Sequence, residues 1–180
     1  VGKALAHYEL GETEEGDTWI KRLVTLARDD SESRREASAT LAGALSLVSR
    51  ITGIAGDPDM VEGPAQTVLA TPERWTLNRM WARTGLALLA IHRSDSEAAA
   101  EQYQTLRPGL LLSGIVMASD RLLGLLAQTM GKLDDAAVHF DDALAFCRKA
   151  GYRPELAWTC LLFTSDAAEF SVWFRLGRWR

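Results

Sequence analysis

Apolar residues recur at steps of three and four positions between residues 120 and 150, and this spacing places them along one side of an α-helix. Gly131 divides the pattern in two, at a point where a glycine ends a helix without steric cost. The first run consists of Leu122, Leu123, Leu126 and Met130, and the second of Ala136, Phe140, Ala143, Leu144 and Cys147. The stretch therefore predicts two antiparallel helices joined by a tight turn.

Charged residues at the ends of the second run agree with this prediction. Carboxylates are favoured near the positive end of the helix dipole and cations near its negative end. Asp134 and Asp135 fall in the first turn, whereas Arg148 and Lys149 fall in the last. Gly151 follows the helix, and a proline at 154 predicts that a further helix begins there.

Small residues and one ring follow the order of a tetratricopeptide repeat in this hairpin. Small residues let two helices approach closely, and the ring fills the gap between neighbouring hairpins. Asp120 and Ala127 depart from the pattern, because the repeat has aromatic residues at both places. The matching positions are Leu123, Gly124, Ala136, Phe140 and Ala143.

Two other stretches repeat this spacing. Near the start of the chain, the positions that correspond to Gly131, Ala136, Phe140 and Ala143 are Gly11, Gly16, Ile20 and Leu23. In the middle of the chain, Ala99, Tyr103 and Leu106 are spaced like Ala136, Phe140 and Ala143, with Gly85 in the place of Gly124 and Ser94 in the place of Gly131. The hairpin therefore predicts an array of related units.

The predicted turns at Gly11, Gly56, Ser94 and Gly131 lie 45, 38 and 37 residues apart. These intervals exceed an ideal repeat of about 34 residues, which indicates a degenerate array. We expect hairpins over about 2–29, 33–70, 73–107 and 111–150, with another beginning at 154 and an atypical tail over 161–180. Pro64 should interrupt the helix expected from Asp59 to Ala70. No run favours a strand, so the predicted fold is all-α, a right-handed superhelical α-solenoid of antiparallel helix hairpins.

Composition narrows the class of protein. The chain is 47% hydrophobic and 24% charged, as an ordinary folded protein is. A net charge of −4 without a basic stripe argues against direct binding of nucleic acid, and no window reaches the roughly 20 apolar residues of a membrane span. Cys147 and Cys160 lie in helical patterns and are interpreted as buried small hydrophobic residues in a reducing cytoplasm. The chain opens at Val1 in the middle of a pattern, which suggests a piece of a longer protein.

Candidate chemistry is sparse. The run from Gly124 to Lys132 has the wrong glycine spacing for a phosphate loop, with a leucine where the metal-binding hydroxyl is required. Asp134 and Asp135, and likewise Asp141 and Asp142, are interpreted as pairs at a helix start and on a solvated surface that do not converge on one face. His7, His92 and His139 have no carboxylate or thiolate partner at ligand spacing. We therefore predict no catalytic residue, no cofactor and no metal site, and expect His139 to face solvent.

Aromatic residues raise one further question. Trp75, Trp81 and Tyr103 could line a concave groove that binds a peptide, as helical repeat arrays often do. The same spacing fits packing between hairpins equally well, and the sequence leaves both interpretations open.

The runs DRLLGLLAQTMGKLDDAAVHF and DDALAFCRKAGYRPELAWTC resemble the tetratricopeptide-rich C-terminal region of large bacterial signalling proteins. These proteins combine a class III adenylate or guanylate cyclase domain, or a LuxR-type DNA-binding domain, with a STAND/AAA-type ATPase module. The resemblance is strongest over 119–160 and extends from about Trp75. It implies a cytoplasmic, non-enzymatic regulatory tail that binds a protein or its own ATPase and output domains. None of the family's catalytic residues has a counterpart here.

Two alternatives follow from the same resemblance. The chain could be the tail of a LuxR-type transcriptional regulator, or a domain that senses a small molecule in a pocket inside the superhelix. The final stretch LLFTSDAAEFSVWFRLGRWR departs from the family pattern. It is interpreted either as sequence that is not native to the protein or as a basic aromatic patch for an anionic surface.

Overall fold

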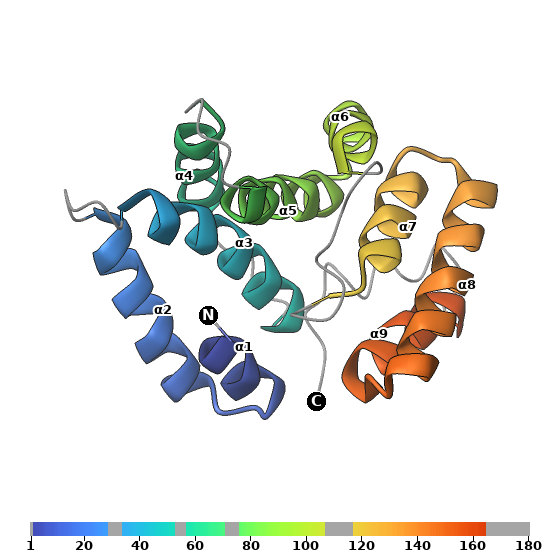
Figure 1. The fold of residues 1–180 in the computed structure, drawn as a ribbon, viewed down its shortest axis with the longest axis horizontal. Helices are drawn as coiled ribbons and strands as arrows, with labels where there is room; N and C mark the ends of the chain where they lie inside the picture. The colour runs from blue at the N-terminus through green and yellow to red at the C-terminus, as the bar shows by residue number, and fades with distance from the viewer. Residues whose placement is uncertain (1, 29–33, 53–56, 71–75, 107–116, 165–180) are drawn as a thin grey trace. The chain divides into compact units, whose positions relative to one another are not determined.

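The computed structural model describes all residues except 1, 29–33, 53–56, 71–75, 107–116 and 165–180 (Figure 1). Within the described ranges the secondary structure is entirely helical, which confirms the all-α prediction. The helices are α1 (Gly2–Glu9), α2 (Thr13–Arg28), α3 (Arg34–Thr52), α4 (Asp59–Ala70), α5 (Thr76–Arg93), α6 (Ser96–Leu106), α7 (Ser119–Thr129), α8 (Leu133–Ala150) and α9 (Arg153–Thr164). Residues 161–164 of the expected atypical tail belong to α9, and the rest of that tail lies outside the described residues.

Four turns between helices share one backbone geometry. Gly11, Ser94, Gly131 and Gly151 all have positive φ angles, from +55° at Ser94 to +79° at Gly11. At Gly131 the amide donates to the carbonyl of Gln128, and the next amide, of Lys132, donates to the carbonyl of Ala127, both at 2.9 Å. The other three turns repeat these bonds to the third and fifth preceding carbonyls, which is the pattern of a Schellman cap.

These caps confirm three of the predicted turns. The equivalence of Ser94 with Gly131 is borne out although serine rarely adopts a left-handed conformation. Asp95 then caps α6, because its Oδ1 accepts hydrogen bonds from the amides of Glu97 and Ala98 at 3.1 and 3.0 Å. The fourth predicted turn, at Gly56, lies outside the described residues.

The chain divides into two compact units, one up to Leu89 and one from Ala90 onward, and the division falls within α5. In the first unit α1 packs on α2 and α3, α2 on α3, and α3 on α4. Helix α3 also crosses α5 closely through Gly43 and Gly85. A Cβ at Gly85 would lie 2.6 Å from the carbonyl oxygen of Ala42, so no larger residue fits there without a shift of the backbone. Gly85 thus packs against another helix backbone, whereas Gly124, its expected counterpart, packs against a ring.

Pro64 does not interrupt α4, contrary to the sequence-based expectation. The helix runs unbroken from Asp59 to Ala70 with the proline inside it. Val61, Ala65 and Val68 recur along one side of the helix and are all buried, in a unit where α4 packs on α3. Burial of this stripe offsets the single backbone hydrogen bond that the proline removes.

In the second unit α6 packs on α7, α7 on α8, and α8 on α9. The core of the α7–α8 hairpin contains the apolar stripes that the sequence predicts, with Leu126 and Cys147 fully buried. A Cβ at Gly124 would overlap the ring of Phe140, which shows how closely the two helices approach. Leu123, Ala136, Phe140 and Ala143 are buried as the repeat pattern requires, and so are Ala99 and Tyr103 of α6.

Candidate functional site

A chain of hydrogen bonds links α6, α7 and α8 in the second unit. The hydroxyl of Tyr103 lies 3.0 Å from Nε2 of His139, and Nδ1 of His139 lies 2.9 Å from Oδ1 of Asp120. The rings of Tyr103 and His139 meet edge to face, with centroids 5.7 Å apart and an interplanar angle of 79°. The His139 imidazole on α8 therefore links the side chain of Tyr103 on α6 to that of Asp120 on α7.

The three side chains of this chain differ in exposure. The Tyr103 side chain is buried, the His139 side chain is 15% exposed, and the Asp120 side chain is 38% exposed. With the Asp120 carboxylate ionised, the imidazole donates Nδ1–H to it and accepts the tyrosine O–H at Nε2. A carboxylate that orients an imidazole toward a hydroxyl is also the arrangement of a general base. Here the hydroxyl belongs to a buried phenol, so the contact fixes the position of Tyr103 and ties three helices together.

The prediction that His139 faces solvent without a partner is wrong. Its two partners lie 19 and 36 residues earlier in the chain, a separation at which helix spacing carries no information. One signal did exist in the sequence: Asp120 is polar at a position where the repeat has an aromatic residue. His7 also has a carboxylate partner, because Nδ1 of His7 lies 2.7 Å from Oε2 of Glu12 across the first turn. His92 is exposed in the last turn of α5.

A buried ion pair joins α7 to α9, and no spacing in the sequence predicts it. The Arg121 and Glu155 side chains are 3% and 2% exposed. Nε of Arg121 donates to Oε1 of Glu155, and Nη2 donates to Oε2 at 2.7 Å, so the contact is bidentate. The amide of Ala118 also donates to Oε1 at 2.7 Å, whereas Nη1 of Arg121 has no partner among the residues that the structure describes.

The two cysteines differ in their surroundings. Cys147 is fully buried, as expected, and burial, together with the charge of Glu155, raises the pKa of its thiol. Cys160 is exposed, so the prediction that it is buried is wrong.

Four aspartates lie on the exposed side of α8. Asp134 and Asp135 stand one helical turn before Val138, and Asp141 and Asp142 stand one turn after it. All four are exposed, and Val138 itself is 62% exposed. The four carboxylates lie on the exposed half of the helix, before and after one apolar side chain. In the described ranges no group of histidine, cysteine, aspartate or glutamate residues is arranged to hold a metal ion.

The aromatic residues expected in a groove have different outcomes. Trp81 is buried, and its ring covers Gly43 so closely that a Cβ at that glycine would overlap it. Tyr103 is buried beside His139. Both placements agree with packing between helices, the alternative that the sequence left open. Trp75 lies outside the described residues.

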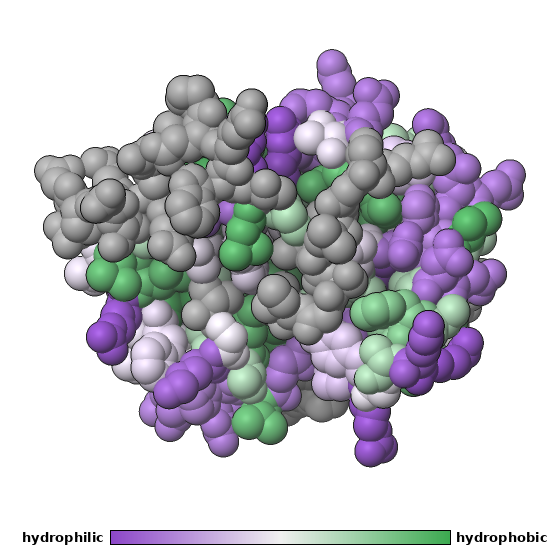
Figure 2. Space-filling model, viewed as in Figure 1, coloured by the Kyte–Doolittle hydropathy of each residue, from purple (hydrophilic) through white to green (hydrophobic). Residues whose placement is uncertain are grey.

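Among the residues drawn in colour in Figure 2, apolar side chains are scattered between hydrophilic ones. Among the helices described, none combines the length and the hydropathy needed to cross a lipid bilayer.

The chain was compared with known protein families, curated proteins and solved structures, and it matches none of them.

Proposed function

We propose that this chain is a non-catalytic protein-interaction module, built as a tetratricopeptide-like α-solenoid of antiparallel hairpins with a right-handed superhelix. In this proposal it serves as the regulatory tail of a bacterial cytoplasmic signalling protein with cyclase and ATPase domains. Repeated helix pairs support it, because the same cap recurs at Gly11, Ser94 and Gly131. The close contact of Phe140 with Gly124 supports it as well, since each residue occupies its place in the repeat.

The proposal of a protein-interaction function rests mainly on the exposed face of α8. Val138 lies opposite the buried stripe of the helix, and leaving a β-branched apolar side chain 62% exposed gains nothing for folding. The surrounding carboxylates of Asp134, Asp135, Asp141 and Asp142 make the site negative. Such a surface fits a partner helix that presents an apolar side chain between cations, because complementary charge selects the partner and small apolar contacts fix its register.

A pair of designed peptides tests this proposal. One helical peptide carries a leucine with lysines one turn before and after it, and the control peptide has glutamates in place of the lysines. We expect the basic peptide to shift the backbone NMR signals around Val138, and the acidic peptide to leave them unchanged. Binding should weaken as salt rises above about 0.15 M, where the screening length falls below about 8 Å. A basic peptide that leaves the α8 signals unchanged would refute the proposed face.

Val138→Ser with Asp141→Asn and Asp142→Asn provides the matched variant. These changes lie on the exposed side of α8 and leave the buried stripe intact. We expect the thermal melting temperature to stay within a few degrees of the wild type, because surface substitutions usually change stability by less than about 0.5 kcal/mol. Peptide binding should be lost.

A further inference from the structure

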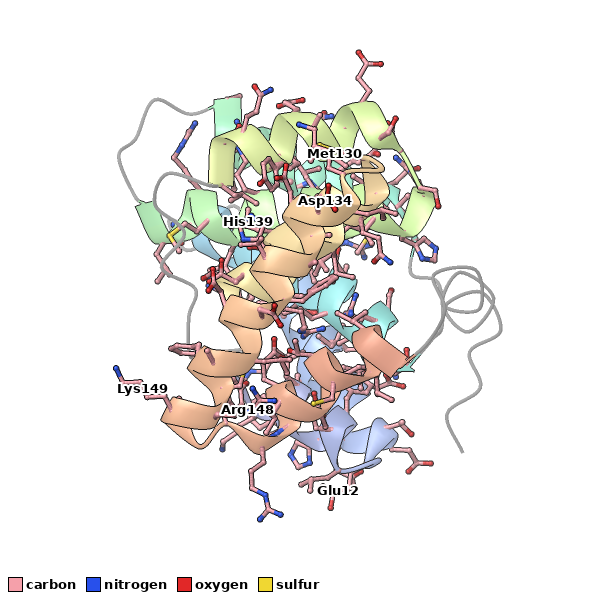
Figure 3. The ribbon with its side chains drawn as sticks, turned by 90° about the vertical axis from the view of Figure 1, so that its right-hand side faces the viewer. Glu12, Met130, Asp134, His139, Arg148 and Lys149 are labelled. Atoms are coloured by element: carbon pink, nitrogen blue, oxygen red, sulfur yellow. The ribbon has the colours of Figure 1, made fainter. Side chains whose placement is uncertain are left out.

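The exposed faces of α2 and α8 occupy corresponding positions in two copies of the same unit, 120 residues apart. Both faces begin with two carboxylates, Glu14 and Glu15 on α2 and Asp134 and Asp135 on α8, and both end with an arginine. Asp134 and the pair Arg148 and Lys149 lie at opposite ends of α8 (Figure 3). Each helix is thus negative at its start and positive at its end, on the side that faces solvent.

The middles of the two faces carry opposite charge. Lys21 and Arg22 of α2 correspond to Asp141 and Asp142 of α8. All four side chains are exposed, and none has an ion-pair partner among the residues described. The difference between the two copies is therefore a reversal of charge at the centre of an otherwise similar surface.

Antiparallel alignment of α2 with α8 brings five pairs of opposite charge together. When Lys21 is placed opposite Asp142, Arg22 lies opposite Asp141, and Thr25 lies opposite Val138. The same register, continued along both helices, gives three further pairs of opposite charge: Arg28 with Asp135, Glu15 with Arg148, and Glu14 with Lys149. On each helix these positions fall within roughly 140° around the axis, so they share one side, as residues at a helix–helix contact do.

Pairing of either helix with its own copy matches charges at the ends but not at the centre. Two α8 helices in the equivalent antiparallel register bring Asp141 of each opposite Asp142 of the other, and two α2 helices bring Lys21 opposite Arg22. Like charges at the centre oppose both self-pairings, so the pattern discriminates in favour of α2 with α8.

We infer that α2 of one molecule docks antiparallel on the α8 face of a second copy of this chain. The inference rests on the proposed function, because it names the occupant of the same α8 face. One helix pair forms a small contact of the weak and transient class. Its affinity depends on charge, so association should appear at high protein concentration and low ionic strength, and disappear in high salt.

Charge reversal provides the test, with sedimentation velocity over a range of concentrations as the measurement. Lys21→Glu with Arg22→Glu makes the α2 face negative, and Asp141→Lys with Asp142→Lys makes the α8 face positive. Each variant alone then presents like charges at the contact, and we expect at least a roughly tenfold loss of the association constant. In an equimolar mixture both contacts regain opposite charges, so the mixture should associate about as strongly as the wild type.

A control variant, Glu9→Lys with Glu97→Lys, changes the net charge as much as the α8 reversal does but at exposed sites away from both faces. It should associate like the wild type. A mixture of the two reversed variants that stays monomeric, or a wild type that stays monomeric throughout, would overturn the inference. If the designed basic peptide still binds α8 in that case, the proposed function stands; if it does not, both fail.

A disulfide between copies provides a second measurement. Thr25→Cys and Val138→Cys, each made with Cys160→Ser, should form a mixed disulfide dimer when the two proteins are combined under glutathione redox buffer. Ala145→Cys with Cys160→Ser is the matched partner for Thr25→Cys, because position 145 is exposed on α8 but two turns out of register. Equal cross-linking at 138 and 145 would refute the antiparallel register.

Discussion

The α1–α2 and α7–α8 hairpins both pack an aromatic ring against a glycine, but the ring and the glycine lie on opposite helices in the two hairpins. In α7–α8 the ring belongs to the second helix, where Phe140 covers Gly124 of the first. In α1–α2 the ring belongs to the first helix, and a Cβ at Gly16 of the second would lie 2.8 Å from the ring of Tyr8. In both hairpins the close approach of the two helices therefore combines one ring with one glycine, and either helix can supply the ring.

The exchange also changes the polar contacts. The hydroxyl of Tyr8 donates to Oδ1 of Asp17 within its own hairpin. Phe140 has no hydroxyl, and the neighbouring His139 instead connects its hairpin to α6 through Tyr103. The two hairpins thus differ in how far their polar contacts reach, and the following substitutions distinguish them.

Phe140→Ala should have the largest effect. It removes a buried ring from the close contact with Gly124 and should cost about 3–5 kcal/mol of unfolding free energy. Tyr8→Ala should cost less, because Ile20, Leu23 and Val24 of α2 are only half-buried. Urea titration followed by circular dichroism measures both. An unchanged midpoint for Phe140→Ala would contradict the packing described here.

Gly124→Ala and Gly16→Ala test the close approach itself. The added methyl group of Gly124→Ala overlaps the Phe140 ring and should cost about 1–3 kcal/mol, partly offset by the higher helix propensity of alanine. Gly16→Ala should cost less, because the Tyr8 ring lies farther from the new Cβ. Thermal melts of the two variants, compared with the wild type, give the order. The reverse order would mean that the ring of Phe140 shifts more easily than that of Tyr8.

His139→Ala and His7→Ala compare a histidine that joins helices with one that does not. His139→Ala removes hydrogen bonds to Asp120 and Tyr103 and should cost about 1–3 kcal/mol. His7→Ala should stay within about 0.5 kcal/mol, because its contact with Glu12 is exposed. Chemical denaturation at pH 7 measures both, and equal losses would show that the link to α6 contributes nothing.

Tyr8→Phe should have a smaller effect at neutral pH than His139→Ala, about 0.5–1.5 kcal/mol for one hydrogen bond. Burial, followed by the hydrogen bond and charge of Asp17, raises the pKa of Tyr8 above its ordinary value of about 10. Above pH 10 the unfolded chain therefore loses this proton before the folded chain does, and stability falls as pH rises. Tyr8→Phe should lose less stability between pH 9 and pH 11 than the wild type does, and parallel curves would contradict the raised pKa.

Local features of the fold could be predicted from the sequence. Turns at Gly11, Ser94 and Gly131 follow from spacing, and even the unusual Ser94 was located by its equivalence to a glycine. The ends of the helices around Gly131 follow from caps and apolar stripes. At Pro64, burial of Val61, Ala65 and Val68 outweighs the local preference of proline. Short-range rules thus determine where helices begin and end.

Long-range polar contacts could not be predicted. Tyr103, His139 and Asp120 come from three helices, and spacing within one helix cannot reveal that they meet. The reversed ring and glycine of α1–α2 could not be predicted for a related reason. The position where the repeat pattern has a ring holds Ile20, so the sequence of this unit resembles a weaker copy of the α7–α8 hairpin. The candidate site is therefore a product of packing between helices, which a single sequence does not encode in a readable pattern.

The ion pair of Arg121 and Glu155 sets a limit on how this protein can be shortened. Truncation after α8 would leave the guanidinium in the interior without its carboxylate, and breaking such a pair typically costs about 3–5 kcal/mol. The α7–α8 hairpin would survive that cut, yet Arg121 would have lost its counter-ion. A minimal version of the second unit must therefore keep the first turn of α9, or replace Arg121 with an apolar side chain of similar length such as methionine.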